Sequence, residues 1–210
     1  MKFVIEHLDN ELYEWCLIEY KHISEIVDKN NLIFTNIKNN NDIKTLENQR
    51  FSGHQKSKGF FSELKMYGDI FEKSFSELNL GNACVLSQYA DKTLASEDKN
   101  KFEYFLFGGI LGDNPAKRRT NEVINKLKKS NVKFEERNLG DKQMSTDAAV
   151  YVAKNILDGR KLNDFKFVDE IEIEINENES VTLPFRYVVE GNKLVINKKL
   201  VDYIRNKKEF

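Results

Sequence analysis

The stretch that decides the fold is KFVIEH at residues 2–7, which is followed by a helical repeat of apolar residues up to about residue 28 and by LIFTNI at residues 32–37. The two short apolar runs are typical of buried strands, and the apolar residues between them recur at the spacing of one helix face. A β-α-β unit of this kind almost always joins parallel strands through a right-handed crossover. The N-terminal part therefore predicts a parallel sheet.

Further apolar runs predict more strands, and amphipathic stretches predict the helices between them. The expected strands are 83–86, 102–107 and 132–137, and the expected helices are 120–129 and 145–157, the second ended by Gly159. Residues 38–80 fit no single period, and we expect a mostly helical excursion there.

The C-terminal part has a different pattern. Residues 171–175 alternate strictly, and the runs 187–189 and 194–196 flank Glu190-Gly191-Asn192, which is typical of an antiparallel hairpin. The predicted fold class is α/β: one domain over residues 1–210, with a mostly parallel sheet flanked by helices and a short antiparallel C-terminal extension.

The composition is that of a globular chain with balanced charge. Of 210 residues, 33 are Lys or Arg and 34 are Asp or Glu, which gives a net charge of −1, and 40% are hydrophobic. This composition fits neither a disordered segment nor a coiled coil. Binding to nucleic acid irrespective of sequence is disfavoured, because it needs an excess of Lys and Arg to neutralise phosphates.

The cysteines and the apolar runs indicate where the protein resides. Cys16 and Cys84 are too few for a disulfide framework, which favours a reducing compartment. The longest apolar run, residues 104–111, is far too short to span a bilayer, and the N-terminal segment has no signal-peptide core. We expect a soluble cytoplasmic protein with no membrane partner.

Common catalytic motifs are absent from the sequence. It contains no G-x-G-x-x-G, no G-x-x-x-x-G-K-[ST], no H-E-x-x-H, no C-x-x-C and no G-x-S-x-G. The three histidines lie far apart along the chain and predict no metal site. Hydride transfer on a standard nucleotide-binding fold, P-loop hydrolysis and zinc chemistry are therefore disfavoured.

Two glycine-containing loops directly follow predicted strands. One is FGGILGD at residues 107–113, and the other begins at Leu139-Gly140. Ligands bind at the carboxyl ends of parallel strands, and glycine lets the backbone approach a ligand closely. The two loops predict a clamp for a small molecule. The alternative is that Gly108 and Gly109 only turn the chain and Gly140 only ends a strand.

Glu19 is unusual, because the repeat 12, 16, 19, 23, 26 places its carboxylate on the apolar face of the first helix. A buried carboxylate needs a partner. One reading is that the partner is an internal cation such as Arg186. Another is that Glu19 lies at the edge of the apolar face and is not buried. The sharper hypothesis is that Glu19 and Glu6 line a cleft that receives a cation from a substrate, with Trp15 stacking on a guanidinium.

Five blocks of the sequence resemble one family. They are MKFVIEH at 1–7, Glu14-Trp15 with Glu19-Tyr20, FGGILGD at 107–113, RNLGDKQM at 137–144 with Thr146-Asp147, and LPFRYV at 183–188. In this order they resemble the SPOUT-superfamily methyltransferases first labelled as predicted RNA methyltransferases. The yeast member of that family is a protein arginine methyltransferase acting on a small-subunit ribosomal protein.

The resemblance implies a sheet whose C-terminal part is threaded as a trefoil knot, an exception to the usual absence of knots. It also implies S-adenosyl-L-methionine as the cofactor, bound by the loops that form the knot. Carried over by motif, the residues of the cofactor site are Leu86, Phe107, Gly108, Gly109, Gly112, Asp113, Leu139, Gly140, Gln143, Met144 and Thr146. One departure is that Leu86 is followed by Ser87-Gln88, where the family tends to have an acidic residue and a proline.

The function that the resemblance implies is N-methylation of a protein arginine, with a monomethylated product on a small-subunit ribosomal protein. As hypotheses, Glu19 grips the guanidinium, Asp113 or Glu6 assists its orientation or proton loss, and Trp15 bounds the slot. Acidic residues beside the methyl donor favour a cationic substrate. We expect a monomer.

Two alternatives stay open. An RNA methyltransferase would use the same cofactor site and the basic helix at residues 117–129 to contact phosphates. A catalytically inactive module bound to ribosomal particles would keep the cofactor site but would not transfer the methyl group. The altered Ser87-Gln88 loop is the observation that keeps this alternative open.

Overall fold

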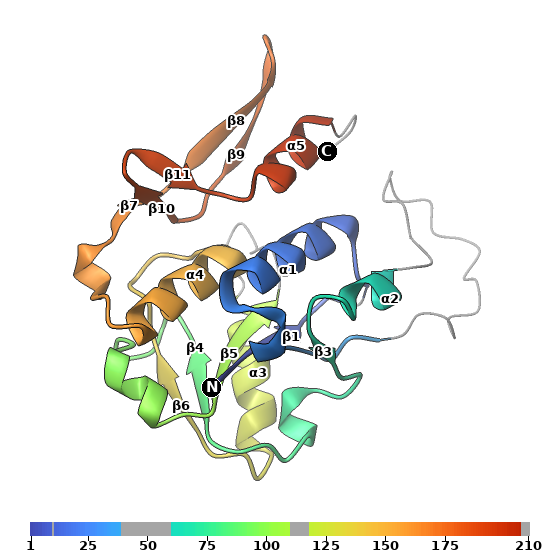
Figure 1. Ribbon diagram of the computed structural model, residues 1–210, viewed down its shortest axis with the longest axis vertical. Coiled ribbons are helices and arrows are strands. Elements are labelled where there is room, and N and C mark those ends of the chain that lie inside the picture. Colours follow the sequence, from blue (N-terminus) through green and yellow to red (C-terminus); the bar gives the residue numbers. More distant parts are fainter. Residues whose placement is uncertain (10, 39–59, 110–117, 207–210) are drawn as a thin grey trace.

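The computed structural model describes residues 1–9, 11–38, 60–109 and 118–206. Its centre is a six-stranded sheet in the order β3-β2-β1-β5-β4-β6, in which every neighbouring pair is parallel (Figure 1). The strands are β1 (Lys2–His7), β2 (Leu32–Thr35), β3 (Asp69–Ile70), β4 (Ala83–Leu86), β5 (Tyr104–Gly109) and β6 (Phe134–Arg137). The parallel sheet and five of its six strands agree with the sequence prediction.

Helices cover both faces of this sheet. α1 (Glu14–Val27) and α4 (Thr146–Leu157) pack on one face, and α3 (Thr120–Lys128) packs on the other (Figure 1). Side chains alternate between the faces of a strand. In β1, Phe3 and Ile5 therefore join the core beneath α1 and α4, whereas Val4 joins the core beneath α3. Burial on both faces explains why the central strands are continuously apolar.

The segment 60–80 is less helical than expected. It holds the short helix α2 (Phe60–Leu64), the edge strand β3 and the 3₁₀ turn η3 (Phe75–Glu77). β3 has only two residues and pairs with Ile33 and Phe34, so it leaves no alternation for a sequence pattern to reveal. The first part of the predicted excursion, residues 39–59, lies outside the described residues.

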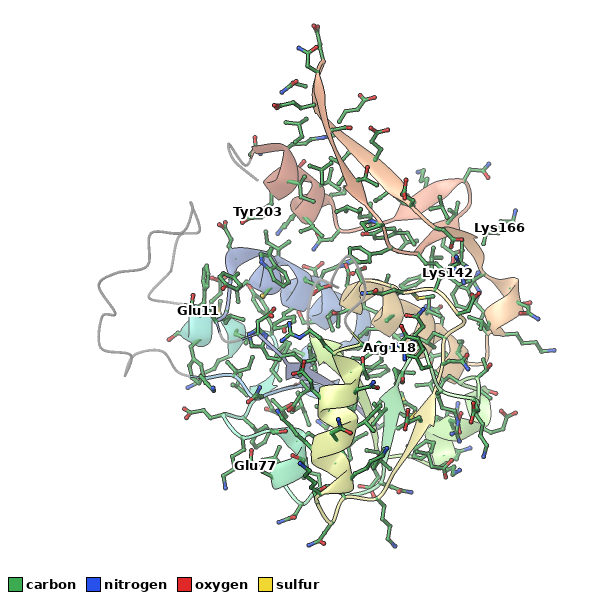
Figure 2. The ribbon with its side chains drawn as sticks, turned by 180° about the vertical axis from the view of Figure 1, so that it is seen from behind. Glu11, Glu77, Arg118, Lys142, Lys166 and Tyr203 are labelled. Carbon is green, nitrogen blue, oxygen red and sulfur yellow. The ribbon has the colours of Figure 1, made fainter. Side chains whose placement is uncertain are left out.

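The C-terminal part forms a separate antiparallel layer above α1 and α4 (Figure 1). The strands β7 (Lys166–Val168), β10 (Tyr187–Glu190) and β11 (Lys193–Val195) form one sheet, and β8 (Ile171–Asn176) and β9 (Glu179–Leu183) form a hairpin that stands away from the body (Figure 2). The predicted hairpin around Gly191 is confirmed, with Val188 opposite Val195. α5 (Lys198–Asn206) packs on β8.

Short 3₁₀ turns join several elements: η1 (Lys29–Asn31), η4 (Ser96–Asn100) and η5 (Leu162–Asp164). After β4 the chain crosses to the end of β6, where the N–H of Asn138 donates to the carbonyl of Lys92 at 2.8 Å and the N–H of Leu94 donates to the carbonyl of Asn138 at 3.0 Å. The crossing brings the loops after β4 and β6 together. The trefoil knot implied by the resemblance stays a prediction.

Candidate functional site

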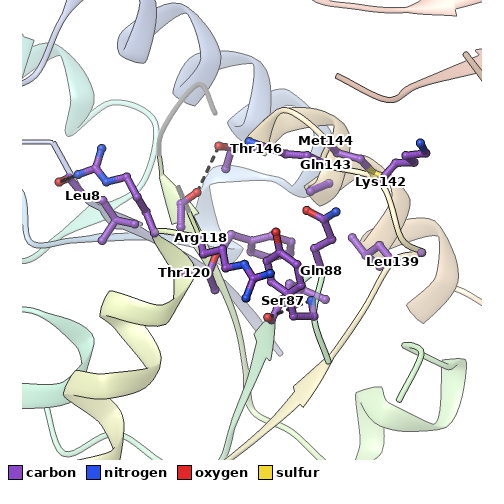
Figure 3. A pocket seen from close by; sticks show the side chains of 17 residues that line it. Leu8, Ser87, Gln88, Arg118, Thr120, Leu139, Lys142, Gln143, Met144 and Thr146 are labelled. Atoms are coloured by element: carbon purple, nitrogen blue, oxygen red, sulfur yellow. Dashed lines mark hydrogen bonds between the residues drawn. The ribbon is translucent and has the colours of Figure 1, made fainter. Parts of the chain in front are cut away.

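A pocket of about 130 Å³ opens at the carboxyl ends of β4, β5 and β6 (Figure 3). Parallel strands end at the same edge of a sheet, so the loops that follow them converge there. The wall of the pocket is formed by the end of β1, the loops after β4 and β6, the end of β5 and the first turns of α3 and α4. The lining residues are Leu8, Leu86, Ser87, Gln88, Tyr89, Phe107, Gly108, Arg118, Arg119, Thr120, Leu139, Gly140, Lys142, Gln143, Met144, Thr146 and Ala149.

The structure brings most of the predicted cofactor residues into this wall. Eight of the eleven line the pocket: Leu86, Phe107, Gly108, Leu139, Gly140, Gln143, Met144 and Thr146. Gly109 lies behind the wall, and Gly112 and Asp113 lie outside the described residues. The catalytic role of Asp113 therefore stays a prediction.

The two glycines at the end of β5 serve different purposes. The carbonyl of Gly108 accepts a hydrogen bond from the hydroxyl of Thr146 at 3.3 Å (Figure 3). A Cβ at Gly109 would lie 2.5 Å from the hydroxyl oxygen of Tyr20 and 2.6 Å from Cγ2 of Ile5. Gly109 is thus required for close packing between β5, β1 and α1, because real Cβ atoms do not approach so closely.

The pocket suits a nucleoside with a charged tail, as the implied cofactor has. Leu86, Phe107, Leu139 and Met144 supply apolar walls for a flat ring. Gly140 has a φ of +100°, a conformation that glycine adopts without strain, and its N–H donates to Oδ1 of Asn138 at 3.1 Å. Polar side chains gather at the opening, among them Gln88 and Arg118, which the sequence did not predict.

Glu19 is completely buried behind this wall. Its Oε1 accepts the backbone N–H of Thr146 at 3.0 Å and that of Asp147 at 3.4 Å, so the carboxylate caps α4 from outside its own sequence. Its Oε2 has no hydrogen-bond partner among the described residues. Burial raises the pKa of Glu19 well above its usual value, and the charge of Asp147 raises it further, while the two N–H donors lower it.

The internal cation expected beside Glu19 is elsewhere. Arg186 pairs with Asp169 at 2.6 Å and with Asp141 at 3.2 Å, so the expectation that it neutralises Glu19 is wrong. The neighbour of Glu19 is instead a second carboxylate, Asp147, whose Oδ2 lies 2.8 Å from Nδ1 of His22 and whose Oδ1 accepts the hydroxyl of Ser145 at 2.6 Å. Asp147 is therefore held by a hydroxyl and by His22, whereas Oε2 of Glu19 has no such partner among the residues that the structure describes.

Glu6 lies on the other face of the sheet. One of its oxygens accepts the hydroxyl of Thr35 at 2.5 Å and the N–H of Phe75 at 2.9 Å, and the other accepts the hydroxyl of Ser74 at 2.5 Å. Lys126 of α3 is 3.5 Å away. The expectation that Glu6 and Glu19 line one cleft is wrong, because alternation along β1 directs Glu6 toward α3 while Glu19 lies beneath α4.

Trp15 is on α1, one turn before Glu19. It is half-buried, and its ring stacks on that of Tyr13 with centroids 6.2 Å apart. Its side chain packs between the main core and the C-terminal layer, away from the pocket wall that the described residues form. Its predicted contact with a guanidinium stays a prediction.

The loop that departs from the family pattern is firmly joined to its neighbours. Ser87 is buried and its N–H donates to the carbonyl of Arg137 at 2.9 Å, while Nε2 of Gln88 donates to the carbonyl of Asp141 at 2.6 Å. In this chain, therefore, a neutral amide bridges the two loops at the pocket opening.

Two further negative findings concern the described residues. No helix among them is long and apolar enough to cross a bilayer, and they contain no group of three or more His, Cys, Asp or Glu side chains suited to a metal ion.

Comparisons with known proteins agree with this geometry. Residues 2–209 match the family described as protein arginine N-methyltransferase SFM1-like. The chain is 35% identical over 207 residues to protein arginine N-methyltransferase SFM1 of Saccharomyces cerevisiae. The alignment covers 98% of this chain and 94% of the yeast protein. The crystal structure of yeast SFM1 complexed with SAM matches with a TM-score of 0.79 and 31% identity, covering 99% of this chain and 92% of that chain.

Two other solved structures extend the comparison. Yeast SFM1 complexed with MTA matches with a TM-score of 0.74 and 31% identity, covering 97% of this chain and 100% of that chain. A Trm10 structure from Thermococcus kodakaraensis shares the fold alone, with a TM-score of 0.56 and 14% identity over 78% of this chain and 95% of that chain. Sequence and structure thus agree over nearly the whole chain, which belongs to the SFM1-like family of protein arginine N-methyltransferases.

Proposed function

We propose that this protein is an S-adenosylmethionine-dependent protein arginine N-methyltransferase. The observation that carries the proposal is the position of Glu19. Its carboxylate is fully buried and joined to the pocket wall through the N–H of Thr146 at 3.0 Å, and its Oε2 has no hydrogen-bond partner in the part of the chain that the structure describes. Yeast SFM1, a relative with 31% identity in both structures, has been crystallised with SAM and with MTA, which supports the same ligand for this pocket.

The bound cofactor supplies a methyl group on a sulfonium, which is activated for attack by a nucleophile. The chain's own residues would hold and align it: the loop at 139–144 and the end of β5 line the pocket that would take the cofactor, and the hydrogen bond from Thr146 to Gly108 fixes the start of α4 beside that pocket. Alignment of donor and acceptor is the main source of rate in such a displacement.

Glu19 has the chemistry to hold an arginine. A guanidinium stays protonated under all ordinary conditions, and it pairs with carboxylates through several N–H donors. Oε2, which has no hydrogen-bond partner among the described residues, is an acceptor for one of them. Methylation of a guanidinium yields a product that is again cationic, so one proton must be released. A guanidinium paired with Glu19 would favour the ionised form of its carboxyl, and this carboxylate, made more basic by burial, is a suitable acceptor for the released proton.

The finer proposals concern the substrate and the setting. We propose a monomethylated arginine on a small-subunit ribosomal protein, a cytoplasmic location and a monomeric enzyme, on the basis of the family resemblance. The hairpin β8–β9 supports a basic protein as partner, because Glu172, Glu174 and Glu179 are exposed on it.

One experiment tests this function against its alternatives. The purified protein is incubated with isotope-labelled S-adenosylmethionine and dissociated small ribosomal subunits, and the proteins and RNA are analysed separately by mass spectrometry. A labelled arginine in a ribosomal protein supports the proposal. Label in RNA alone favours an RNA methyltransferase, and cofactor binding without transfer favours an inactive module; either result overturns it.

A further inference from the structure

Three cationic side chains line the pocket opening, and they differ in how far their charge is already neutralised. Arg119 donates to Oδ1 of Asp9 at 2.7 Å, to Oε1 of Glu122 at 3.3 Å and to the carbonyl of Leu8. Its donors are therefore committed to holding the start of α3 against the end of β1.

Arg118 is not committed in this way. Within the part of the chain that the structure describes, its recorded contact is with the ring of Tyr89, at 4.3 Å from the guanidinium carbon to the ring centroid, and no carboxylate pairs with it. Tyr89 belongs to the loop after β4 and is 47% exposed, so the contact joins two sides of the pocket opening.

The stacked geometry leaves the useful edge of the guanidinium free. A guanidinium that lies over an aromatic ring uses its face, whereas its five N–H donors point outward in its own plane. Tyr89 therefore orients the group without consuming its donors. The backbone of Arg118 has a φ of +53°, a left-handed conformation that is uncommon outside glycine and that clusters at ligand sites.

Lys142, the third cation, is a weaker candidate for binding an anion. It is exposed in the loop after β6, and it lies close enough to Asp169 to contribute to the lowered pKa of that carboxyl. An ammonium is also a strongly hydrated point charge that cannot make the paired, in-plane contact of an arginine.

The anionic group that this pocket has to accommodate is the carboxylate of the cofactor's methionine part, since the rest of S-adenosylmethionine is neutral or cationic. We propose that Arg118, held by Tyr89, binds this α-carboxylate and thereby selects the intact amino-acid end of the cofactor. The inference rests on the proposed function, because it assumes that this pocket holds S-adenosylmethionine.

Titration calorimetry with two ligands tests it. S-adenosylmethionine and its decarboxylated form both carry the sulfonium and the amine, and they differ only in the carboxylate. The wild-type protein should bind the intact form about 10- to 100-fold more tightly, as expected for a charge-assisted hydrogen bond. Arg118→Met keeps the length and apolar stem of the side chain and should remove this preference, leaving affinity for the decarboxylated form within about threefold.

The matched control is Lys142→Met, which removes the other uncommitted cation and should leave the preference intact. Equal weakening of both ligands in Arg118→Met overturns the proposal, because Arg118 would then be a wall of the pocket rather than a carboxylate partner. Unchanged preference in that variant, or its loss in Lys142→Met, also overturns it. Failure of the proposed function is distinguishable: if the pocket does not hold S-adenosylmethionine, the wild-type protein binds neither ligand, and if it holds the cofactor without methylating arginine, the transfer assay above fails while the preference for the intact form remains.

Discussion

Glu19 and Thr146 are joined by a hydrogen bond of 3.0 Å from the backbone N–H of Thr146 to Oε1 of Glu19. The hydroxyl of the same threonine donates to the carbonyl of Gly108 in the pocket wall. One residue therefore connects the proposed substrate carboxylate on α1 with the cofactor pocket at the end of β5. Both side chains are buried, so this connection holds the two sites at a fixed distance on well-packed secondary-structure elements.

Glu19→Gln is expected to separate cofactor binding from methyl transfer. The amide keeps an acceptor for the N–H of Thr146, so the pocket wall stays in place and cofactor affinity should change by less than about threefold. The negative charge and the proton acceptor are lost, so transfer to a substrate protein should fall by about 100-fold or more. Calorimetry measures the first quantity, and mass spectrometry of the methylated product measures the second.

Glu6→Gln is the matched control, since Glu6 is another completely buried glutamate. Its partners are Thr35, Ser74 and Phe75 on the far face of the sheet, so its replacement should lower stability and leave transfer by the folded fraction close to the wild-type rate. Turnover by Glu19→Gln above a tenth of the wild-type rate would remove Glu19 from the mechanism.

The raised pKa of Glu19 predicts how stability depends on pH. The folded protein holds this proton more tightly than the unfolded chain, in which a glutamate titrates near about 4.3. Above that pH the native state therefore binds more protons, and the free energy of unfolding contributed by Glu19 falls as the pH rises toward the folded pKa. The neutral amide of Glu19→Gln has no such loss.

Urea denaturation of the wild-type protein and of Glu19→Gln measures this effect. The pH is varied from about 4.5, just above the pKa of a glutamate in the unfolded chain, to about 7.5. The stability of the variant relative to wild type should increase with pH. Titratable groups that do not contact Glu19 are common to both proteins, so their contributions largely cancel in the difference. A difference that is independent of pH would show that Glu19 keeps an ordinary pKa in the folded protein.

The sequence predicted the elements that repeat a simple period and missed those that do not. β1, β2, β4 and β5 are largely apolar runs packed on both faces, and the β10–β11 hairpin has a clear turn. β6 is more polar, and its prediction came from the alternation of Val132, Lys133 and Phe134. β3 is too short to show a period. The sequence also indicated that Glu19 is buried, because a helix repeat fixes the face on which a side chain lies.

The sequence alone could not predict which groups contact the carboxylate of Glu19. Alternation in β1 separates Glu6 from Phe3 and Ile5, but it does not say which face α1 covers, so the sequence alone does not separate Glu6 from Glu19. Arg118 and Gln88 entered the site through loops, whose paths follow from the crossing of the chain after β4 and not from any local pattern.

Arg137 and Asp98 form a buried ion pair whose loss should be costly. Nε and Nη2 of Arg137 each donate to one oxygen of Asp98 at 3.0 Å, and both side chains are almost fully buried, so the pair ties η4 to β6. Arg137→Met leaves the carboxylate unpaired and should lower the free energy of unfolding by about 3–5 kcal/mol. Asp158→Asn, which breaks the exposed pair with Lys154, should change it by less than about 0.5 kcal/mol. Equal effects in urea denaturation would contradict this assignment.

Gly140 and Gly159 offer a matched pair for testing the cofactor loop. Both have positive φ, +100° and +109°, but Gly140 lines the pocket and Gly159 ends α4 with open space around it. A Cβ at Gly140 would lie 3.4 Å from Nη1 of Arg186, so backbone strain and not a steric clash is the main cost there. Valine at either position should lower the free energy of unfolding by about 1–3 kcal/mol.

Only the change at Gly140 should weaken cofactor binding, because relief of its strain moves the loop at 139–144 that forms the pocket wall. We expect a loss of about tenfold or more in affinity for S-adenosylmethionine in Gly140→Val, the size of one lost hydrogen bond or more, and an affinity within about twofold of wild type in Gly159→Val. Calorimetry at a temperature where both variants are folded measures the two constants. If Gly140→Val bound the cofactor as tightly as Gly159→Val, the loop after β6 would not be part of the cofactor site.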